Sequence, residues 1–408
     1  MPFRRTRTLV RGDTRPVTAP TQPLARTPIV LAFALALAAA VSLGLARFSY
    51  ALLLPPMRAQ LHWSYFTAGA MNTANAAGYL AGALLARRWF ARHDALRVAT
   101  AGGLATAAIL VAHAFATSDA LLYALRTLAG VASAATFVGG GLLATRLSAR
   151  APHPGLVVGL YYGGAGLGIL GATAIVPPLP WRGAWVALGV VSLACTLATW
   201  GVTRASRALV PTGPDAPSAG RTRAPWAPMG ALLVGYLMFG FGYIGYMTFI
   251  VTLLRDQGLS PARVAAFFGL LGACTVASSW IWAGLLQRHR GGRPLAQLNA
   301  ILAVATLLPV LGTQPAMVAL SCVLFGSSFL SVVASTTAFV RHNLAPPAWA
   351  AGIGAFTIVF ALGQILGPSL SGLLADGPGG LRRGFVFSTI VLALGALLAA
   401  RQRPLAPR

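Results

Sequence analysis

Apolar residues fill long runs along this chain, and short polar breaks separate the runs. A membrane-spanning helix needs about 20 mostly apolar residues. Twelve runs approach or exceed that length, and they cover residues 28–56, 65–86, 95–116, 119–146, 155–177, 182–203, 226–254, 262–286, 295–313, 315–340, 348–374 and 383–402. The pattern predicts an all-α membrane protein with twelve transmembrane helices.

Arginines are concentrated in every second break between these runs. The richer side carries the N-terminal segment, the breaks near residues 87–97, 146–150, 204–223 and 288–293, Arg341 and the C-terminal segment. Loops rich in Lys and Arg stay in the cytoplasm. Both termini are therefore predicted to be cytoplasmic, as an even number of spans also requires. The excess of Ala, Gly and Arg over Lys is typical of a GC-rich bacterial source, so we expect a multi-pass protein of the bacterial inner membrane.

The long polar break divides the chain into two halves of six runs each. We predict a disordered cytoplasmic tail at 1–27, a six-helix bundle at 28–203, a linker at 204–225, a second six-helix bundle at 226–402 and a short tail at 403–408. The first spans of the halves resemble each other, with Gly44–Tyr50 (GLARFSY) matching Gly240–Tyr246 (GFGYIGY). Two pseudo-symmetric bundles predict a site between them.

Composition supports the membrane class and excludes several others. The chain is 57% apolar and 9% charged, whereas soluble domains carry about 25% charged residues. The net charge of +25 follows membrane orientation, so no nucleic-acid partner is predicted. The chain contains no lysine and no glutamate, which excludes a Walker loop and an HExxH zinc helix. We predict no cofactor, no metal site and no enzymatic activity.

Two arginines lie deep in apolar runs without an acidic neighbour. Arg47 is roughly 13 Å from the outer end of the first span, and Arg126 roughly 10 Å from the outer end of the fourth. All six carboxylates of the chain lie near the ends of runs or outside them. Arginine inside a membrane marks a functional site by default, and a guanidinium suits a carboxylate or another oxyanion. Two other interpretations stay open: Arg126 braces backbone carbonyls of a neighbouring helix, or Arg47 extends to the interface.

Several motifs resemble those of the major facilitator superfamily. Leu122–Gly130 (LYALRTLAG) is similar to the L-x-x-x-R-x-x-Q-G element of the fourth helix, with alanine in place of glutamine. Gly82, Leu84 and Arg87–Arg88 match part of the loop motif after the second helix, whose aspartate is missing here. Leu45–Pro55 (LARFSYALLLP) resembles the YbfB/YjiJ branch.

The resemblance implies two bundles that rock about a central cavity lined by helices 1, 4, 7 and 10. It places Arg47 and Arg126 on cavity-lining helices. On the seventh span, Tyr243 and Tyr246 match the register of Arg47 and Tyr50. A polar residue on the eleventh span, in the GQILGP string, is a further candidate. The predicted substrate-binding residues are Arg47, Tyr50, Arg126, Tyr243, Tyr246 and Gln364.

The functional prediction is a secondary transporter that moves a small organic solute, with an anionic cargo as the hypothesis. The alternatives are a multidrug or sugar efflux antiporter and, more remotely, an intramembrane enzyme or sensor. Because no carboxylate lies inside a run, we expect facilitated diffusion, exchange, or a coupling proton carried on the substrate's own acid group. The lipid bilayer and a small-molecule substrate are the expected partners. The identity of the substrate, the direction of transport and the oligomeric state stay open.

Overall fold

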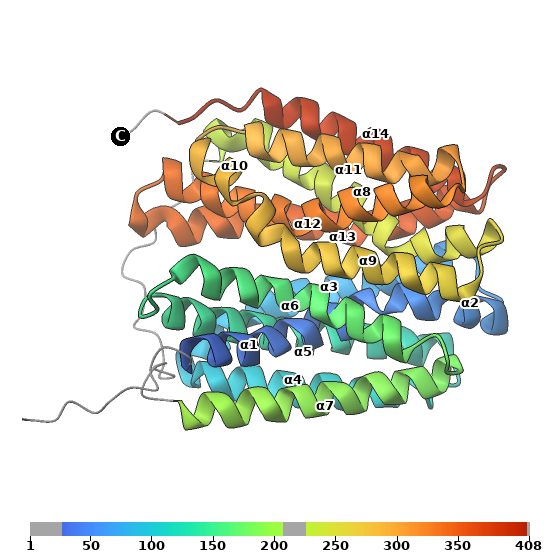
Figure 1. Ribbon diagram of the computed structural model, residues 1–408, viewed down its shortest axis with the longest axis horizontal. Coiled ribbons are helices and arrows are strands. Elements are labelled where there is room, and N and C mark those ends of the chain that lie inside the picture. Colours follow the sequence, from blue (N-terminus) through green and yellow to red (C-terminus); the bar gives the residue numbers. More distant parts are fainter. Residues whose placement is uncertain (1–26, 207–225, 406–408) are drawn as a thin grey trace, which may run out of the picture.

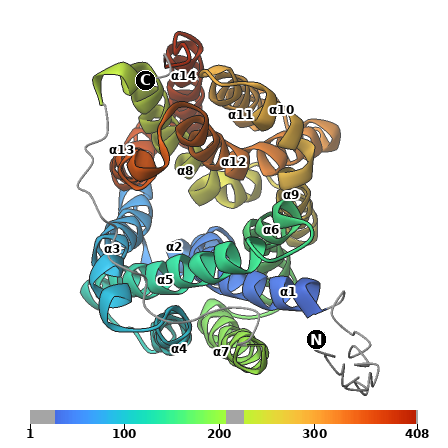
Figure 2. The same cartoon turned by 90° about the vertical axis from the view of Figure 1, so that its left-hand side faces the viewer.

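The computed structural model describes residues 27–206 and 226–405, and in these ranges every regular element is a helix. The predicted tail at 1–27 and linker at 204–225 lie almost entirely outside the described residues, as do the last residues of the C-terminal tail. Two groups of helices stand side by side, as Figures 1 and 2 show. The first residues of α1 and the last residues of α14 lie at the same end of the molecule (Figure 1).

The N-terminal helices occupy the positions of the first six predicted spans. The first span is built from three consecutive elements, and single helices account for the others. They are α1 (Thr27–Ala39), η1 (Ala40–Phe48), α2 (Tyr50–Leu61), α3 (Tyr65–Arg92), α4 (Ala95–His113), α5 (Asp119–Ser148), α6 (Pro154–Ile175) and α7 (Trp181–Ala205).

The C-terminal helices occupy the positions of the other six. The eighth predicted span is broken at Trp282, where the backbone leaves the helical conformation. The elements are η2 (Ala227–Met229), α8 (Gly230–Asp256), α9 (Pro261–Ile281), α10 (Ala283–Arg288), α11 (Arg293–Leu311), α12 (Pro315–Asn343), η3 (Pro346–Ala348), α13 (Trp349–Ala375) and α14 (Leu381–Ala400).

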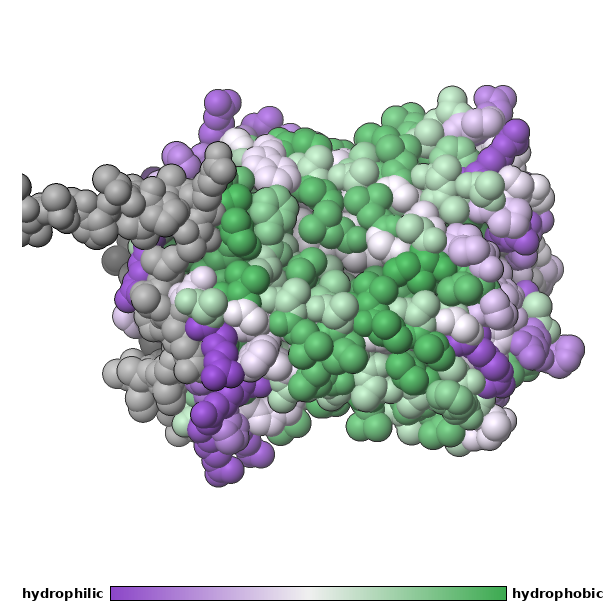
Figure 3. Space-filling model, turned by 60° about the horizontal axis from the view of Figure 1, so that its bottom comes forward, coloured by the Kyte–Doolittle hydropathy of each residue, from purple (hydrophilic) through white to green (hydrophobic). Residues whose placement is uncertain are grey.

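Eleven segments of the described chain are long and apolar enough to cross a membrane, when contiguous helices are counted as one. The predicted span at 65–86 is not among them. Asn72 and Asn75 lie inside this span and lower its mean hydropathy. Apolar residues cover the middle of the visible face of the molecule, and polar residues lie toward its two ends (Figure 3). The chain is a multi-pass membrane protein.

Polar side chains fix where several of these helices begin. The hydroxyl of Ser64 accepts a hydrogen bond from the backbone N–H of Thr67 at 3.0 Å, and the Asp94 carboxylate accepts one from Arg97 N–H at 2.7 Å. Such N-caps satisfy backbone donors that have no partner inside the helix. Both caps are local, because each bonds a residue three positions further along its own helix.

The N-terminal helices contact the C-terminal helices mainly through α3 with α13, α6 with α9, and α2 with α8. Glycines allow the close approach in two of these pairs. A Cβ atom on Gly69 would lie 2.2 Å from the Pro368 carbonyl oxygen, and one on Gly166 would lie 2.5 Å from the Gly272 carbonyl oxygen. Small residues at these positions let backbones pack closely, as is common between membrane helices.

Candidate functional site

Arg47 lies where the N-terminal and C-terminal helices meet. It belongs to η1, and its side chain is only 4% exposed. Its Nη2 atom donates a hydrogen bond to Oε1 of Gln364 on α13 at 2.8 Å, and Nε2 of Gln364 donates to the Tyr243 hydroxyl on α8. The guanidinium carbon lies 5.7 Å from the ring centre of Tyr79 on α3. The structure thus brings together three of the predicted residues, Arg47, Tyr243 and Gln364.

The Arg47 guanidinium has unused hydrogen-bonding capacity. Its Nε atom is buried and has no hydrogen-bond partner among the described residues. No carboxylate of the described residues lies within salt-bridge distance of Arg47 or Arg126. A buried charge without a counter-charge is costly. The arrangement can therefore accept an anion without displacing an internal acid.

Arg126 is equally buried, but its donors are used inside the protein. Its Nη1 atom donates to the Ala46 carbonyl at 3.1 Å and its Nη2 atom to Oδ1 of Asn72 at 3.1 Å. Its Nε atom donates to the Met71 carbonyl at 3.5 Å. These bonds tie α5 to η1 and α3, as the bracing interpretation of Arg126 predicts. The Ala46 carbonyl that it holds belongs to the residue directly before Arg47.

Two asparagines extend this network, and both make the interhelical hydrogen bonds expected of amides in membrane helices. Asn75 donates to the Arg126 carbonyl at 3.0 Å. Asn72, besides accepting from Arg126, donates to the Thr248 hydroxyl on α8 at 2.7 Å. Arg126 is therefore linked through one amide to the C-terminal helices.

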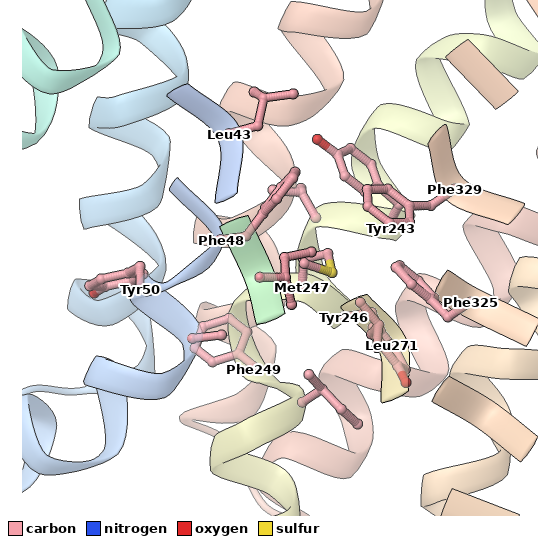
Figure 4. Packing of buried hydrophobic residues seen from close by; sticks show 14 of the residues in the cluster. Leu43, Phe48, Tyr50, Tyr243, Tyr246, Met247, Phe249, Leu271, Phe325 and Phe329 are labelled. Atoms are coloured by element: carbon pink, nitrogen blue, oxygen red, sulfur yellow. The ribbon is translucent and has the colours of Figure 1, made fainter. Parts of the chain in front are cut away.

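Tyr50 and Tyr246 make their hydrogen bonds with residues other than Arg47. The Tyr50 hydroxyl donates to the Ala68 carbonyl at 3.0 Å, and its ring centre lies 4.5 Å from the Arg126 guanidinium carbon. The Tyr246 hydroxyl lies 2.8 Å from the Ser321 hydroxyl on α12. Figure 4 shows the Tyr243 and Tyr246 hydroxyls pointing in different directions, with Tyr50 on the far side of the cluster. These two tyrosines, Tyr50 and Tyr246, support the scaffold around Arg47 and Tyr243.

The helix that carries Arg47 is not α-helical at that point. Residues 40–48 form a π-helix, and the Ser49 N–H donates to the Gly44 carbonyl, five residues earlier, at 2.9 Å. Such wider turns occur frequently at functional sites. No specific signal in the sequence marks this turn, and the predicted span at 28–56 was a single helix. Tyr79 was also missed as a neighbour of Arg47.

Comparisons with known proteins agree with this architecture. The family described as "Uncharacterised MFS-type transporter YbfB" matches residues 39–400. The chain is 28% identical over 251 residues to the transcription regulatory protein OpdE of Pseudomonas aeruginosa, a match that covers 58% of this chain and 61% of that protein. The chain thus spans less than two thirds of the length of this curated relative.

Solved structures with the same fold include two transporters. A bacterial homologue of the human lysosomal transporter Spinster, in an inward-facing and unoccupied conformation, has a TM-score of 0.69 at 16% identity, and the match covers 93% of this chain and 97% of that one. The nucleoside transporter NupG has a TM-score of 0.66 at 15% identity, with 93% of this chain and 98% of that one covered. With the family match over most of its length, the chain belongs to the YbfB-type family of MFS transporters.

Proposed function

We propose that this protein is a secondary transporter that moves a small organic anion across the bacterial inner membrane by alternating access. Its twelve spans, α3 included, form two six-helix bundles, and both termini lie in the cytoplasm. Arg47 binds the negative group of the cargo, while Gln364 and Tyr243 supply further polar contacts. The family and the fold support transport. The anionic cargo is supported by one observation, the buried Arg47 guanidinium with a free Nε and no acidic partner among the described residues.

A reorientation of two bundles is supported by where their polar contacts lie. At the end where α3 begins, Asp376 at the end of α13 accepts hydrogen bonds from the backbone N–H groups of Tyr65 and Phe66, and Asp256 of α8 accepts one from the Tyr65 hydroxyl. By the distribution of arginines this is the periplasmic end. The described conformation is then one closed toward the periplasm.

The test compares Arg47→Gln with the wild type in two measurements on the purified protein. A panel of organic anions is titrated by calorimetry, and thermal unfolding is followed without ligand. We expect Arg47→Gln to lose anion binding while its unfolding temperature is unchanged or higher, because the substitution removes a buried charge. Arg47→Lys should restore little binding, since an ammonium lacks the planar fork of donors.

Arg255→Gln is the matched control, because Arg255 lies exposed in the last turn of α8. It removes the same charge outside the site and should leave binding unchanged. Wild-type anion affinity in Arg47→Gln would refute the anionic site. Loss of binding accompanied by a large drop in unfolding temperature would instead assign Arg47 a structural role.

A further inference from the structure

Arg47 lies beside a stack of parallel aromatic rings, which we call the aromatic stack and which comprises Tyr236, Phe239, Tyr243, Phe329 and Phe360. Phe239 and Phe360 have ring centres 5.4 Å apart and planes inclined by 7°. Phe239 and Tyr243 lie 4.6 Å apart at 19°. The stack joins α8, α12 and α13, and it reaches Arg47 through the hydrogen bond between Tyr243 and Gln364.

A second aromatic group lies on the N-terminal helices and consists of Tyr79, Phe137, Tyr161 and Tyr162. The ring centres of Tyr79 and Phe137 are 6.5 Å apart, and those of Phe137 and Tyr162 are 6.0 Å apart. Tyr79 also lies against the Arg47 guanidinium. Arg47 is thus flanked by aromatic residues of both halves of the chain.

The two aromatic groups meet at Arg47. Tyr79 lies 5.7 Å from the Arg47 guanidinium carbon, and Tyr243 is joined to the same guanidinium through Gln364. Tyr162 is 37% exposed and lies against Phe137 of α5. Tyr79 and Phe360 are half-buried. Tyr79 beside Arg47 and Phe360 beside Tyr243 therefore keep some accessible surface in the neighbourhood of Arg47, whose own Nε is buried.

We propose that the anion bound by Arg47 is an aromatic carboxylate, with its carboxylate on the guanidinium and its ring against these aromatic side chains. This inference rests on the proposed function, since it requires Arg47 to bind an anion. A carboxylate accepts two parallel hydrogen bonds from a guanidinium. Aromatic pairs gain energy beyond the burial of area, so a flat ring is favoured over a saturated ring of similar size.

Four small probes separate charge from ring shape. Benzoate has both features, cyclohexanecarboxylate keeps the charge on a saturated ring, benzamide keeps the ring without the charge, and acetate keeps the charge alone. Each is titrated by calorimetry, at a pH where the acids are ionised, into the full-length protein in detergent. We expect benzoate to bind about three- to tenfold more tightly than cyclohexanecarboxylate, and both acetate and benzamide to bind more weakly than either.

Variants locate the preference on the aromatic residues. Phe360→Leu should reduce the affinity for benzoate several-fold and leave that for cyclohexanecarboxylate unchanged. Tyr162→Leu should also reduce the affinity for benzoate and leave that for cyclohexanecarboxylate unchanged. Because Tyr162 is exposed, this substitution should not affect folding. Phe385→Leu is the control, because Phe385 is a buried ring of α14 that stacks with neither group; it should not change the ratio of the two affinities.

The outcomes distinguish this inference from the proposed function. Equal binding of benzoate and cyclohexanecarboxylate, both lost in Arg47→Gln, would overturn the aromatic inference and leave the anionic site intact. If none of the four probes binds while another organic anion binds in an Arg47-dependent manner, the aromatic inference is likewise overturned and the anionic site is likewise left intact. Absence of any Arg47-dependent binding would refute the proposed function itself.

Discussion

Asp376 offers the sharpest test of how the two halves are held together. Asp376 follows the last residue of α13. Its carboxylate accepts hydrogen bonds from the backbone N–H groups of the first two residues of α3, Tyr65 at 2.7 Å and Phe66 at 2.9 Å. An aspartate of one half thus caps a helix of the other half. Replacing it by alanine removes both bonds and a negative charge from the positive end of α3. We expect Asp376→Ala to favour opening at this end.

The size of the effect follows from ordinary capping energies. Replacing an N-cap Asp by Ala costs about 1 kcal/mol, within a range of about 0.5–2. Asp376 is solvent-exposed, so water replaces part of what is lost, and values near the upper limit are not expected. A change of about 1 kcal/mol alters an equilibrium constant about fivefold. The ratio of open to closed molecules should therefore rise about fivefold.

Distances between spin labels measure that ratio. Labels at Ala59→Cys on α2 and Arg382→Cys on α14, both exposed positions, report separation at the relevant end. The native Cys195, Cys274 and Cys322 are first replaced by alanine. In Asp376→Ala the population with a second, longer distance should appear, or its ratio to the short-distance population should rise about fivefold.

Asp94→Ala is the matched control for this experiment. Asp94 also caps a helix, but α4 and its cap belong to the same half. It should cost similar stability without moving the labels apart. An unchanged distance distribution in Asp376→Ala, or an equal shift in Asp94→Ala, would refute the reasoning.

Two further predictions concern the scaffold around Arg47. Arg126→Gln should lower the free energy of unfolding by about 2–4 kcal/mol, because the buried Ala46 and Met71 carbonyls lose their donor. Chemical denaturation measures this loss, and weaker anion binding should accompany it. A variant as stable as the wild type would contradict the bracing role. Gly44→Ala should destabilise by about 1–3 kcal/mol, because a Cβ there would lie 2.4 Å from Gly168 Cα. Gly141→Ala, whose Cβ would meet nothing closer than 3.5 Å, should be neutral or stabilising. Chemical denaturation measures both glycine variants, and equal stability of the two would contradict the packing argument.

The positions of the helices could be predicted from the sequence because the membrane dictates them. A bilayer requires long apolar runs whose backbone groups are satisfied within each helix, so the runs mark the helices directly. The π-helix at 40–48 and the break at Trp282 could not be predicted this way. Both change hydrogen bonding within a run without changing its polarity, and hydropathy contains no information about them.

The site could be predicted only in part, for a different reason. Polar residues in apolar runs identified Arg47, Arg126 and Gln364 as candidates, since each is costly to bury. Which of them meet depends on contacts between distant helices, such as that of η1 with α13. In sequence the two arginines looked alike, and only the packing separates them. The aromatic neighbour Tyr79 was missed because, unlike Tyr243 and Tyr246, it matched no register that related it to Arg47.

The different hydrogen-bond partners of the two arginines also bear on the kind of cargo. Arg126 meets carbonyl oxygens and an amide, so its burial is compensated inside the protein. Arg47 has one neutral hydrogen-bond partner, Gln364, and its Nε has none among the described residues. A site for a sugar or an apolar drug needs no cation, and such a cargo would not offset the desolvation of a guanidinium. An anion reverses that balance, because charge-assisted hydrogen bonds are roughly twice as strong as neutral ones. On the proposed function, the negative group of the cargo supplies the counter-charge that Arg47 lacks among the described residues, and this favours an anionic cargo over either efflux alternative.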